Sequence, residues 1–452
     1  MTTERSQRFD FSGLCLPRDW RLLPLGGVVS ARSGNSKLIK GKQHTEPGTG
    51  RFPGYSASGQ DVYCDGFEHD GDAVIISAVG ARCGKCFLAH GRWSAVANTH
   101  ILFPQADKIE HKFLWYLVNN EEFWVKSGTA QPFVKVGKTL ELPIPVPPLD
   151  QQKRIVAEIE KQFSRLDEAV ANLKRVKANL KRYKAAVLKA AVEGRLVETE
   201  AELARREGRI YETGEQLLQR ILETRRSQWQ GKGKYKEPAA PDTTDLPELP
   251  EGWVWATLEQ LCPTFVDSAH RTPKYGETGK PAIGPRDVVG GDLRLESARL
   301  VDDNEFAVQT KRHIPQSGDI VYSRELSLGW GAVVPEDATL CLSQGMCLFR
   351  PDDQVVLSYF MYSLNGPEVR RQATRGSTGS AHPHLNLGDI KAFIFSLPPQ
   401  SEQHRIVAEV DRRLSLLRET EAQVDANLAC AERLRQSILW AGFSDSLSLS
   451  NQ

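Results

Sequence analysis

Residues 147–196 read PPLDQQKRIVAEIEKQFSRLDEAVANLKRVKANLKRYKAAVLKAAVEGRL, and this stretch decides the fold of the chain. Pro147 and Pro148 oppose a helix before them, and Asp150 is a favourable N-terminal cap. Apolar residues then recur every three or four positions, and Gly194 marks the expected end. The pattern predicts one helix of roughly 65–70 Å with a narrow apolar stripe, which needs a partner to cover it.

The partner is predicted within the same chain. Residues 398–442 read PPQSEQHRIVAEVDRRLSLLRETEAQVDANLACAERLRQSILWAG, and both stretches contain RIVAE after a Pro-Pro pair. This long-period repeat predicts two similar helices that bury their stripes against each other as an antiparallel coiled coil with pseudo-two-fold symmetry. The predicted helix-pair interface comprises Ile155, Ile159, Phe163, Leu166, Leu173, Leu180, Val187, Ile406, Val410, Leu414, Leu417, Val424 and Ile438.

The globular parts repeat as well, mainly at their edges. LPRDWRLLPL at 16–25 resembles LPEGWVWATL at 249–258, and GTAQPFVKVG at 128–137 resembles GSAHPHLNLG at 379–388. Short apolar runs punctuated by Gly and Pro predict strands between these edges. We therefore expect an α+β chain with two globular domains of mixed strands and helices, joined and separated by the two long helices. The expected boundaries are 1–148 for the first domain, 149–196 for the central helix, 197–248 for a charged helix and flexible linker, 249–399 for the second domain, 400–441 for the last helix and 442–452 for a tail.

Composition narrows the class of protein. The chain has 452 residues, 58 Lys and Arg against 57 Asp and Glu, and eight scattered cysteines. The cysteine pattern favours reduced thiols, and we expect a cytoplasmic protein. No apolar run is long enough to cross a membrane, and the N-terminus lacks a signal-peptide pattern, so no membrane partner is expected.

The order of globular unit, long helix, globular unit and long helix suggests two DNA-recognition units held at a fixed spacing by the helices. One helical turn of DNA measures about 34–36 Å, so helices of this length suit readers one to two turns apart. Because the two units differ in sequence, the implied target is bipartite and asymmetric.

The two helix starts, PPLDQQKRIVAEIEKQFSRLD and PPQSEQHRIVAEVDRRLSLL, resemble the duplicated regions of type I restriction-modification specificity subunits. LPEGWVWATL and GSAHPHLN resemble segments of their target-recognition domains, and GDAVIISAVGARCGK and GDIVYSRELSLGWG resemble strand-turn elements inside them. The resemblance covers nearly the whole chain in the expected order. Gln151 departs from the usual Glu, which stands at Glu402, and Gln400 departs from Leu149 of the first copy.

The resemblance implies a DNA sequence-specificity subunit without catalysis of its own. Each target-recognition domain would read one half of a double-stranded DNA target, and the helices would set the spacer and dock two modification (methyltransferase) subunits. No cofactor is implied for this chain. S-adenosylmethionine would bind the modification partner, and ATP and Mg would bind restriction (motor-nuclease) subunits.

The residues themselves contain no catalytic signature. There is no Asn/Asp-Pro-Pro-aromatic tetrapeptide for adenine methylation and no phosphate-binding GxxxxGK[ST] motif. Cys83 and Cys86 form a lone CxxC near Cys64 and His90, which is a weak metal signal; the intervening Gly-Lys favours a hairpin turn, and no metal site is expected.

Residues that could read DNA are polar side chains in loops, because Arg and Lys suit guanine and Asn and Gln suit adenine. The candidates are Arg32, Asn35, Lys37, Lys42, Gln43, Tyr55, Arg82, Lys85, Gln131, His270, Arg271, Lys274, Tyr275, Arg286, Arg324, Arg375, His382, His384 and Asn386. For each of them alone, a solvated surface position is the commoner explanation.

Two alternatives remain open. The chain could be the recognition part of a fused methyltransferase or nuclease, which methyl transfer by the chain alone would reveal. It could also be a coiled-coil scaffold that does not touch DNA, which duplex binding in the presence of the modification partner would exclude.

Overall fold

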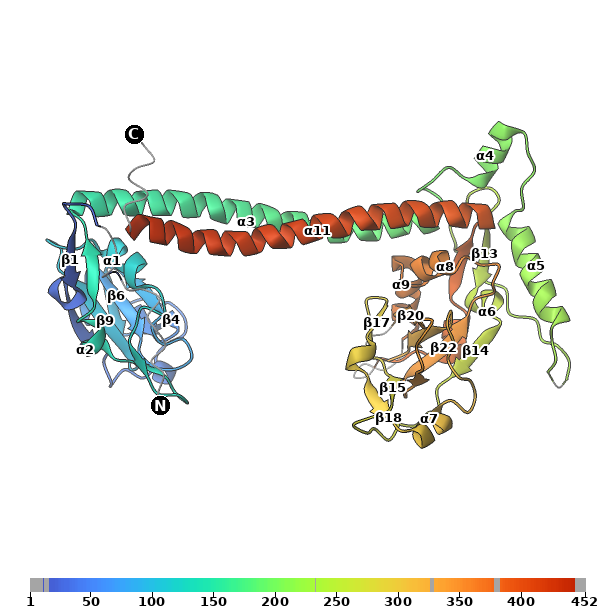
Figure 1. Ribbon diagram of the computed structural model, residues 1–452, viewed down its shortest axis with the longest axis horizontal. Coiled ribbons are helices and arrows are strands. Elements are labelled where there is room, and N and C mark those ends of the chain that lie inside the picture. Colours follow the sequence, from blue (N-terminus) through green and yellow to red (C-terminus); the bar gives the residue numbers. More distant parts are fainter. Residues whose placement is uncertain (1–10, 12–15, 232, 326–328, 378–382, 444–452) are drawn as a thin grey trace. The chain divides into compact units, whose positions relative to one another are not determined.

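The computed structural model describes residues 11, 16–231, 233–325, 329–377 and 383–443 (Figure 1). The chain divides into two compact units. Unit 1 contains residues 1–174 and 425–452, and unit 2 contains residues 175–424. Two long helices, α3 (Leu149–Val192) and α11 (Gln400–Phe443), each contribute one segment to both units. None of the helices in the described part is long and apolar enough to span a membrane.

The ends of α3 follow from its sequence. The helix begins directly after Pro148, and it ends before Gly194, whose φ of 67° is left-handed. The Arg195 amide donates to the Ala190 carbonyl at 2.9 Å and satisfies one of the last carbonyls. A Cβ on Gly194 would lie 2.4 Å from Pro250 Cγ, so both backbone conformation and space require glycine here.

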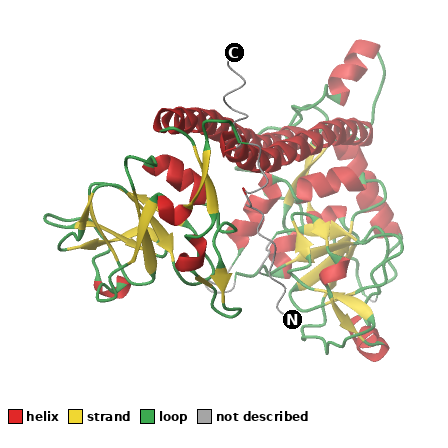
Figure 2. Cartoon of the chain, turned by 60° about the vertical axis from the view of Figure 1, so that its left-hand side comes forward, coloured by secondary structure: helices red, strands yellow, loops and turns green. Residues whose placement is uncertain are grey.

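Unit 1 is built around two four-stranded sheets, ordered β2-β9-β6-β7 and β4-β3-β8-β5, with a pair β1-β12 beside α3 and a small pair β10-β11. Figure 2 shows the strands of each unit in yellow and the helices in red. The elements of unit 1 before α3 are β1 (Arg21–Pro24), η2 (Leu25–Gly27), β2 (Val29–Ser33), η3 (Lys40–Lys42), β3 (Phe52–Ser56), β4 (Gly59–Cys64), β5 (His69–Asp70), β6 (Ala73–Ser77), β7 (Cys86–Ala89), β8 (Arg92–Ala95), β9 (Thr99–Pro104), α1 (His111–Val118), β10 (Lys126–Ser127), β11 (Phe133–Val134), α2 (Val136–Thr139) and β12 (Pro143–Val146).

The long helices run antiparallel within unit 1. Asp167 of α3 forms an ion pair with Arg435 of α11, and the Arg435 guanidinium lies 4.4 Å from the centre of the Phe163 ring. Further toward the C-terminus of α11, Gly442 packs against Ile159, earlier in α3. Residue numbers therefore decrease along α3 as they increase along α11, which is the antiparallel arrangement. The apolar residues of this pair join the main core of the unit together with α1.

Unit 2 has a four-stranded sheet β14-β22-β19-β20, a three-stranded sheet β18-β15-β21 and pairs β13-β23 and β16-β17. Its elements between the long helices are α4 (Glu200–Glu207), α5 (Gly214–Ser227), β13 (Val254–Thr257), α6 (Leu258–Leu261), β14 (Thr264–Asp267), β15 (Lys280–Ile283), β16 (Val288–Val289), β17 (Asp292–Leu293), η4 (Leu295–Ser297), β18 (Arg299–Val301), α7 (Asp303–Gln309), β19 (Ile320–Ser323), β20 (Gly331–Val333), β21 (Cys341–Leu342), β22 (Met346–Arg350), α8 (Leu357–Leu364), α9 (Pro367–Gly376), α10 (Leu387–Lys391) and β23 (Ile394–Leu397).

The long helices are antiparallel in unit 2 as well. Val187 and Ala191 of α3 share an apolar cluster with Ile406 and Val410 of α11. Near the end of α3, the Val192 carbonyl accepts a hydrogen bond from Ser396 Oγ, just before α11 begins, at 2.7 Å. Charged residues after α3 form two separate helices, α4 and α5, each opened by a capping box at Thr199 or Thr213.

The two units share one topology in their main sheets. Strands β2, β9, β6 and β7 of unit 1 correspond in order to β14, β22, β19 and β20 of unit 2, and the pairs β1-β12 and β13-β23 also correspond. All main-sheet neighbours in these two sheets are antiparallel. The mixed α+β organisation, with two similar units and long helices paired antiparallel within each, agrees with the predicted fold class.

Candidate nucleic-acid interface

One end of the main sheet in unit 1 gathers the polar loops. Strand register pairs Ser33 with His100 and Ser77 with Thr99. The loops that follow β2 and β6 therefore leave the sheet at the same end. The start of α3 lies at the other end, where Gln152 bonds the Lys108 carbonyl at 2.9 Å, just after β9. The loops consequently face away from the long helices within this unit.

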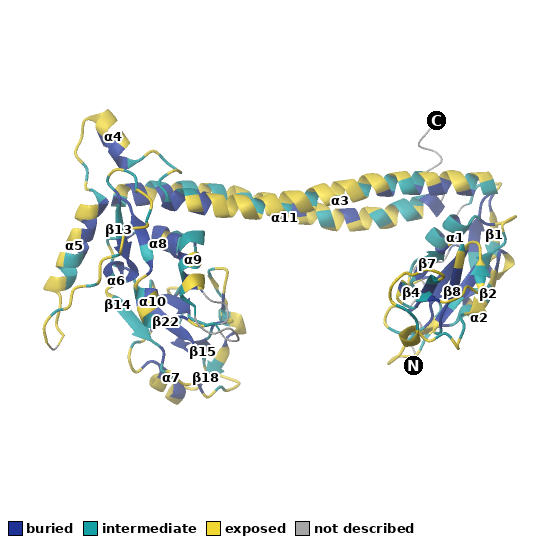
Figure 3. Cartoon of the chain, turned by 180° about the vertical axis from the view of Figure 1, so that it is seen from behind, coloured by how far each residue is buried: buried dark blue, intermediate teal, exposed yellow. Residues whose placement is uncertain are grey.

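We call this region the loop edge of unit 1 and define it as residues 34–44, 78–85, 96–98 and 128–135. Isolated bridges hold the loops in place and join Asn35 to Val96 and Val79 to Phe133. The Gly80 amide also donates to the Pro132 carbonyl at 2.9 Å. Figure 3 shows exposed residues in yellow on loops of unit 1, around buried strands.

The loop edge brings together most candidates of unit 1. Lys37, Lys42, Arg82 and Gln131 are exposed, and Asn35, Gln43 and Lys85 are half-buried. Asn35 is engaged locally, because its amide nitrogen donates to Glu68 and its oxygen accepts from the Lys37 amide at 2.8 Å. Arg32 lies next to this edge on β2, exposed, with its guanidinium 5.7 Å from the centre of the Phe103 ring.

Tyr55 differs from the other candidates. Only 9% of its surface is exposed, and its ring packs edge-on against Trp93 at 6.0 Å between centres. Burial raises the pKa of its hydroxyl. These contacts give Tyr55 a packing role in the core of the β3 sheet.

Unit 2 has an equivalent loop edge, defined as residues 268–276, 324–325, 329–330, 343–345 and 383–386. Strands β14 and β19 both end here, because each is antiparallel to β22. The Arg324 amide donates to the Gly345 carbonyl at 2.9 Å, and the Leu385 amide donates to the Arg324 carbonyl at 3.0 Å. An isolated bridge joins Glu325 to His384, as Val79 is joined to Phe133 in unit 1. The sequence repeat aligns Phe133 with His384, so the same backbone contact is made twice in the chain.

The candidates of unit 2 lie on or beside this edge. His270, Arg271, Lys274, Arg286, Arg375, His384 and Asn386 are exposed, and Tyr275 and Arg324 are half-buried. The Tyr275 ring carries the Arg299 guanidinium 3.6 Å from its centre. His382 lies outside the described residues.

Two arginine candidates are held by carboxylates. Arg324 Nη1 bonds Asp267 at 2.7 Å, and its Nε donates to the Leu385 carbonyl at 3.0 Å. Arg271 Nη2 donates to both carboxylate oxygens of the buried Glu305. Burial opposes ionisation of Glu305, but hydrogen bonds from Gln309 and Arg271 outweigh it and lower the pKa of Glu305. Both arginines therefore fix the shape of the loop edge.

The structure adds one cationic group that the sequence reading did not select. The Arg370 guanidinium lies 3.7 Å from the centre of the Trp330 ring, and Ala373 of the same helix contacts Gly329. Arg370 and Trp330 are 40 positions apart in the sequence, and no spacing pattern signals their contact. A cation stacked on tryptophan beside the loop edge is suited to contact DNA phosphates.

Matched anchors hold each unit onto the start of its long helix. Gln152 donates to the Pro147 carbonyl at 2.8 Å and accepts from the Glu110 amide at 2.8 Å. Gln403 donates to the Pro398 carbonyl and accepts from the Val356 amide, each at 2.9 Å. The repeat aligned these glutamines, and the structure gives them the same task at α1 and α8.

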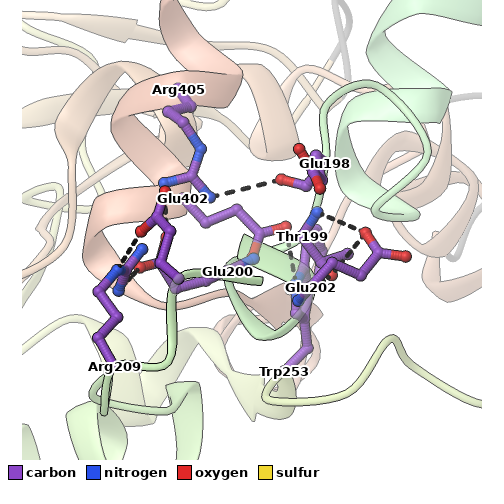
Figure 4. A network of polar contacts seen from close by, with 9 residues as sticks. Glu198, Thr199, Glu200, Glu202, Arg209, Trp253, Glu402 and Arg405 are labelled. Carbon is purple, nitrogen blue, oxygen red and sulfur yellow. Dashed lines mark hydrogen bonds and ion pairs between the residues drawn. The ribbon is translucent and has the colours of Figure 1, made fainter. Parts of the chain in front are cut away.

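The departure of Gln151 from Glu402 has a structural counterpart. Trp20 Nε1 donates to Gln151 and Trp253 Nε1 donates to Glu402, both at 3.0 Å. Glu402 also accepts from the Glu200 amide at 2.8 Å, which fastens α4 to the start of α11 (Figure 4). Burial raises the pKa of Glu402. The Glu402 carboxylate therefore accepts two hydrogen bonds, one from Trp253 and one from the Glu200 amide. In the described part of unit 1, Gln151 accepts the equivalent bond from Trp20, and no backbone amide takes the place of the Glu200 amide.

Cys83 lies in the turn between β6 and β7, and Cys86 is the first residue of β7, which agrees with the predicted hairpin. Cys83 and Cys86 are buried, and Cys86 Sγ donates to the Val118 carbonyl at 3.4 Å. Burial raises the pKa of the Cys86 thiol above its ordinary range. In the described ranges, no three His, Cys, Asp or Glu side chains are grouped as metal ligands.

The predicted helix-pair residues are all at least partly covered. Ile155, Ile159, Phe163, Val187, Ile406, Val410 and Val424 are buried, and Leu166, Leu173, Leu180, Leu414, Leu417 and Ile438 are half-buried. The clusters of each unit contain residues of both long helices.

Comparison with known proteins identifies the family. The profile described as "Type I restriction modification DNA specificity domain" matches residues 17–182 and 250–426. The chain is 24% identical over 351 residues to the EcoBI specificity subunit of Escherichia coli, covering 76% of this chain and 67% of that protein. It is 22% identical to the Escherichia coli EcoDI specificity subunit, covering 96% of this chain and 90% of that protein.

Solved structures establish the fold. One chain from a study of assembly and conformational transition in a type I restriction-modification system gives a TM-score of 0.62 at 17% identity, covering 95% of this chain and 98% of that one. The HsdS subunit of Thermoanaerobacter tengcongensis gives 0.55 at 19% identity, covering 95% and 97%. The predicted fold class and family are confirmed: this chain belongs to the type I restriction-modification DNA specificity family, and its role is that of a DNA sequence-specificity subunit.

Proposed function

We propose that each unit reads one half of a bipartite, asymmetric DNA target with its loop edge. The observation that carries this proposal is the doubled edge, in which Val79–Phe133 and Glu325–His384 make the same bridge from different side chains. Because the backbone of the two loop edges is placed in the same way, each edge can present its loops to a DNA groove in the same orientation. Because the side chains of the two edges differ, they select different bases. Arg82 and Gln131 are the leading base readers in unit 1, and His384 and Asn386 are those in unit 2.

The long helices set the spacing between the half-sites in this proposal. Each helix has 44 residues and contributes to both units, so it corresponds to about 66 Å at 1.5 Å per residue. A continuous helix transmits distance without a flexible joint, and the antiparallel partner stiffens it. The spacer length of the target would follow from the register of this pair.

The same helices would dock two modification subunits. Within unit 2, Val176, Tyr183 and Leu416 have 40%, 47% and 52% of their surface exposed on the helix pair. Large apolar side chains that remain exposed on a paired helix suit a protein interface. The loops point away from this pair within each unit, so docking and reading would not compete for one surface.

Catalysis would reside in the partners. The modification subunits would bind S-adenosylmethionine and methylate adenine, and restriction subunits with ATP and Mg could join them. The proposal assigns no chemistry to this chain, whose polar clusters support loops and helix starts.

The test is methyl transfer from radiolabelled S-adenosylmethionine to genomic DNA of a strain that lacks the system. We expect transfer only when this chain and its modification subunit are both present. Transfer by this chain alone would contradict the proposal and favour a fused enzyme. Unchanged transfer without the chain, with no duplex binding by the assembly, would favour the scaffold alternative.

A further inference from the structure

Unit 2 contains a basic and aromatic segment whose function is not explained by target reading. Residues 225–236 read RRSQWQGKGKYK, with five Lys or Arg, two aromatic residues and no Asp or Glu. The sequence predicts a flexible linker from the Gly and Lys content of this region. Basic runs interleaved with aromatic residues are also typical of nucleic-acid contacts.

The structure folds the described part of this segment back onto α5. Arg226 Nε bonds Glu237 at 2.6 Å, and the rings of Trp229 and Tyr235 pack edge to face with centres 5.7 Å apart. A Cβ on Gly231 would lie 2.1 Å from the Trp229 ring, and Gly233 has a φ of 105°. Both glycines are thus required for the return of the chain.

The fold-back lines an open pocket of about 510 Å³ between α5, α6 and the segment. Its lining includes Arg225, Trp229, Lys234, Tyr235 and Lys236. Trp229 has 49% of its surface exposed, which leaves its indole accessible for stacking. The volume lies in the range of sites that hold a nucleotide-sized group.

The charge of the pocket favours an anionic ligand. Its two carboxylates are already engaged, since Glu237 pairs with Arg226 and Glu259 pairs with Lys391 at 3.0 Å. Lys234 and Lys236 form no ion pair in the part of the chain that the structure describes. Two unpaired ammonium groups beside an accessible indole suit phosphates followed by a stacked base.

The pocket lies apart from the loop edge of unit 2. Pro263 lines it and directly precedes β14, whereas the loop edge follows Asp267 at the opposite end of that strand. A ligand in the pocket therefore contacts none of the candidate base readers. Its contacts would be to backbone and ring faces, which are common to all sequences.

We propose that this pocket is a second, sequence-independent nucleic-acid site, in which Lys234 and Lys236 bind strand phosphates and Trp229 stacks on a base. The site would hold DNA outside the target, either a flanking duplex or an exposed single strand. It goes beyond the reading of the two half-sites and does not depend on it.

The experiment uses the full chain bound to its modification subunit. Fluorescence anisotropy would follow three labelled DNAs: a 20-nucleotide oligo(dT), a duplex without the target and a duplex with it. Trp229→Ala should weaken oligo(dT) binding by about 5-fold to 150-fold, the range measured for one stacked base, and Trp229→Phe should retain most of the affinity. If Trp229→Ala weakens binding of the duplex without the target more than binding of oligo(dT), the natural ligand of the pocket is flanking duplex DNA.

The lysines are tested by salt dependence. Lys234→Ala/Lys236→Ala should reduce the slope of log affinity against log salt by about 1.4 for oligo(dT), because each phosphate contact on a single strand contributes about 0.7. Lys234→Arg/Lys236→Arg is the matched control and should preserve the slope. Methylation of target DNA at saturation should remain unchanged in all variants.

Equal affinities and slopes for every variant would overturn the proposal. Loss of co-elution with the modification subunit in the Ala variants, with DNA binding intact, would also overturn it and assign the pocket to a protein partner. Retention of the circular-dichroism melting curve shows that the segment still folds, and the Phe and Arg variants test the site even if the Ala variants do not.

Discussion

At the scale of single residues, Arg324 and Arg82 should behave differently although both are arginines of a loop edge. Arg324 is paired with Asp267, whose side chain is 10% exposed. Arg324→Ala removes one ion-pair partner of that carboxylate and leaves it only His270. Because the carboxylate is largely buried, the loss should cost up to about 3–5 kcal/mol of stability. We expect the variant to melt at lower temperature and to bind all DNA sequences more weakly.

Arg82 is exposed on the turn after β6, where its carbonyl accepts from the Lys85 amide at 3.1 Å. Its guanidinium forms no hydrogen bond or ion pair to another described residue. Arg82→Ala should leave the melting temperature unchanged and cost about 1–3 kcal/mol of binding at one base pair. Competition assays with single-substitution duplexes would measure both variants. A uniform loss over all sequences for Arg82→Ala would mark a phosphate contact instead.

Glu402 should give unit 2 a pH-dependent stability. Burial raises its pKa above the ordinary value of about 4.3. The folded state therefore holds the proton more tightly, so the contribution of Glu402 is present below the ordinary pKa and is lost as pH rises through the raised value. We expect the melting temperature of wild type minus that of Glu402→Gln to fall as pH rises from about 4 upward. Glu419→Gln, an exposed position on the same helix, is the control. A difference that does not change with pH would contradict the assignment.

The roles of single residues could be predicted from the sequence only in part. The alignment of Gln152 with Gln403 was visible because both copies repeat it, and the shared anchoring role followed from the structure. The fixation of Arg271 by Glu305 and the burial of Tyr55 could not be predicted, because they depend on chain segments that no periodicity brings together. Residue type alone does not separate a base reader from an arginine that supports a loop.

At the scale of elements, the helix pair should respond to loss of buried volume. Ile159 is fully buried on α3 and packs against Gly442 of α11. Ile159→Ala should destabilise unit 1 by about 2–5 kcal/mol through the lost contacts and the cavity. Hydrogen exchange at the α1 amides would report the change, because α1 shares this core. Leu434→Ala, at a position with 47% exposure, should have little effect. Equal exchange in both variants would show that Ile159 does not support the unit.

The same helices carry the spacing hypothesis. Inserting about one helical turn of four residues into α3 after Lys177 should lengthen the DNA spacer and keep both half-sites, because the loop edges are not altered. The readout is the methylated sequence in cells that carry the variant with its modification subunit. An unchanged spacer would show that the helices do not set it.

The elements were the part of the fold that the sequence predicted best. Pro148 and Gly194 mark the ends of α3. Proline disfavours a helical conformation in the residue before it, and Gly194 adopts the left-handed φ of 67° that ends the helix. The predicted charged helix after α3 is instead two helices, since Gly208 ends α4 with a φ of 67°. The sheets were less visible, because two-residue strands such as β10 and β16 leave no alternating pattern.

At the scale of the whole molecule, the chain repeats one topology with two sets of surface residues. The main sheets correspond strand by strand, while the side chains at the loop edges differ. Duplication of a scaffold with divergence of its loops gives two specificities within one polypeptide. Substitutions in one unit should therefore alter one half-site and leave the other unchanged.

The central claim is that this chain alone chooses a bipartite, asymmetric target. The most direct measurement is a genome-wide map of adenine methylation in a host that expresses this chain and its modification subunit, with the chain deleted as control. We predict one motif with two different halves and a fixed unspecific spacer, which disappears when the chain is deleted. A continuous motif, or methylation that persists without the chain, would contradict this account.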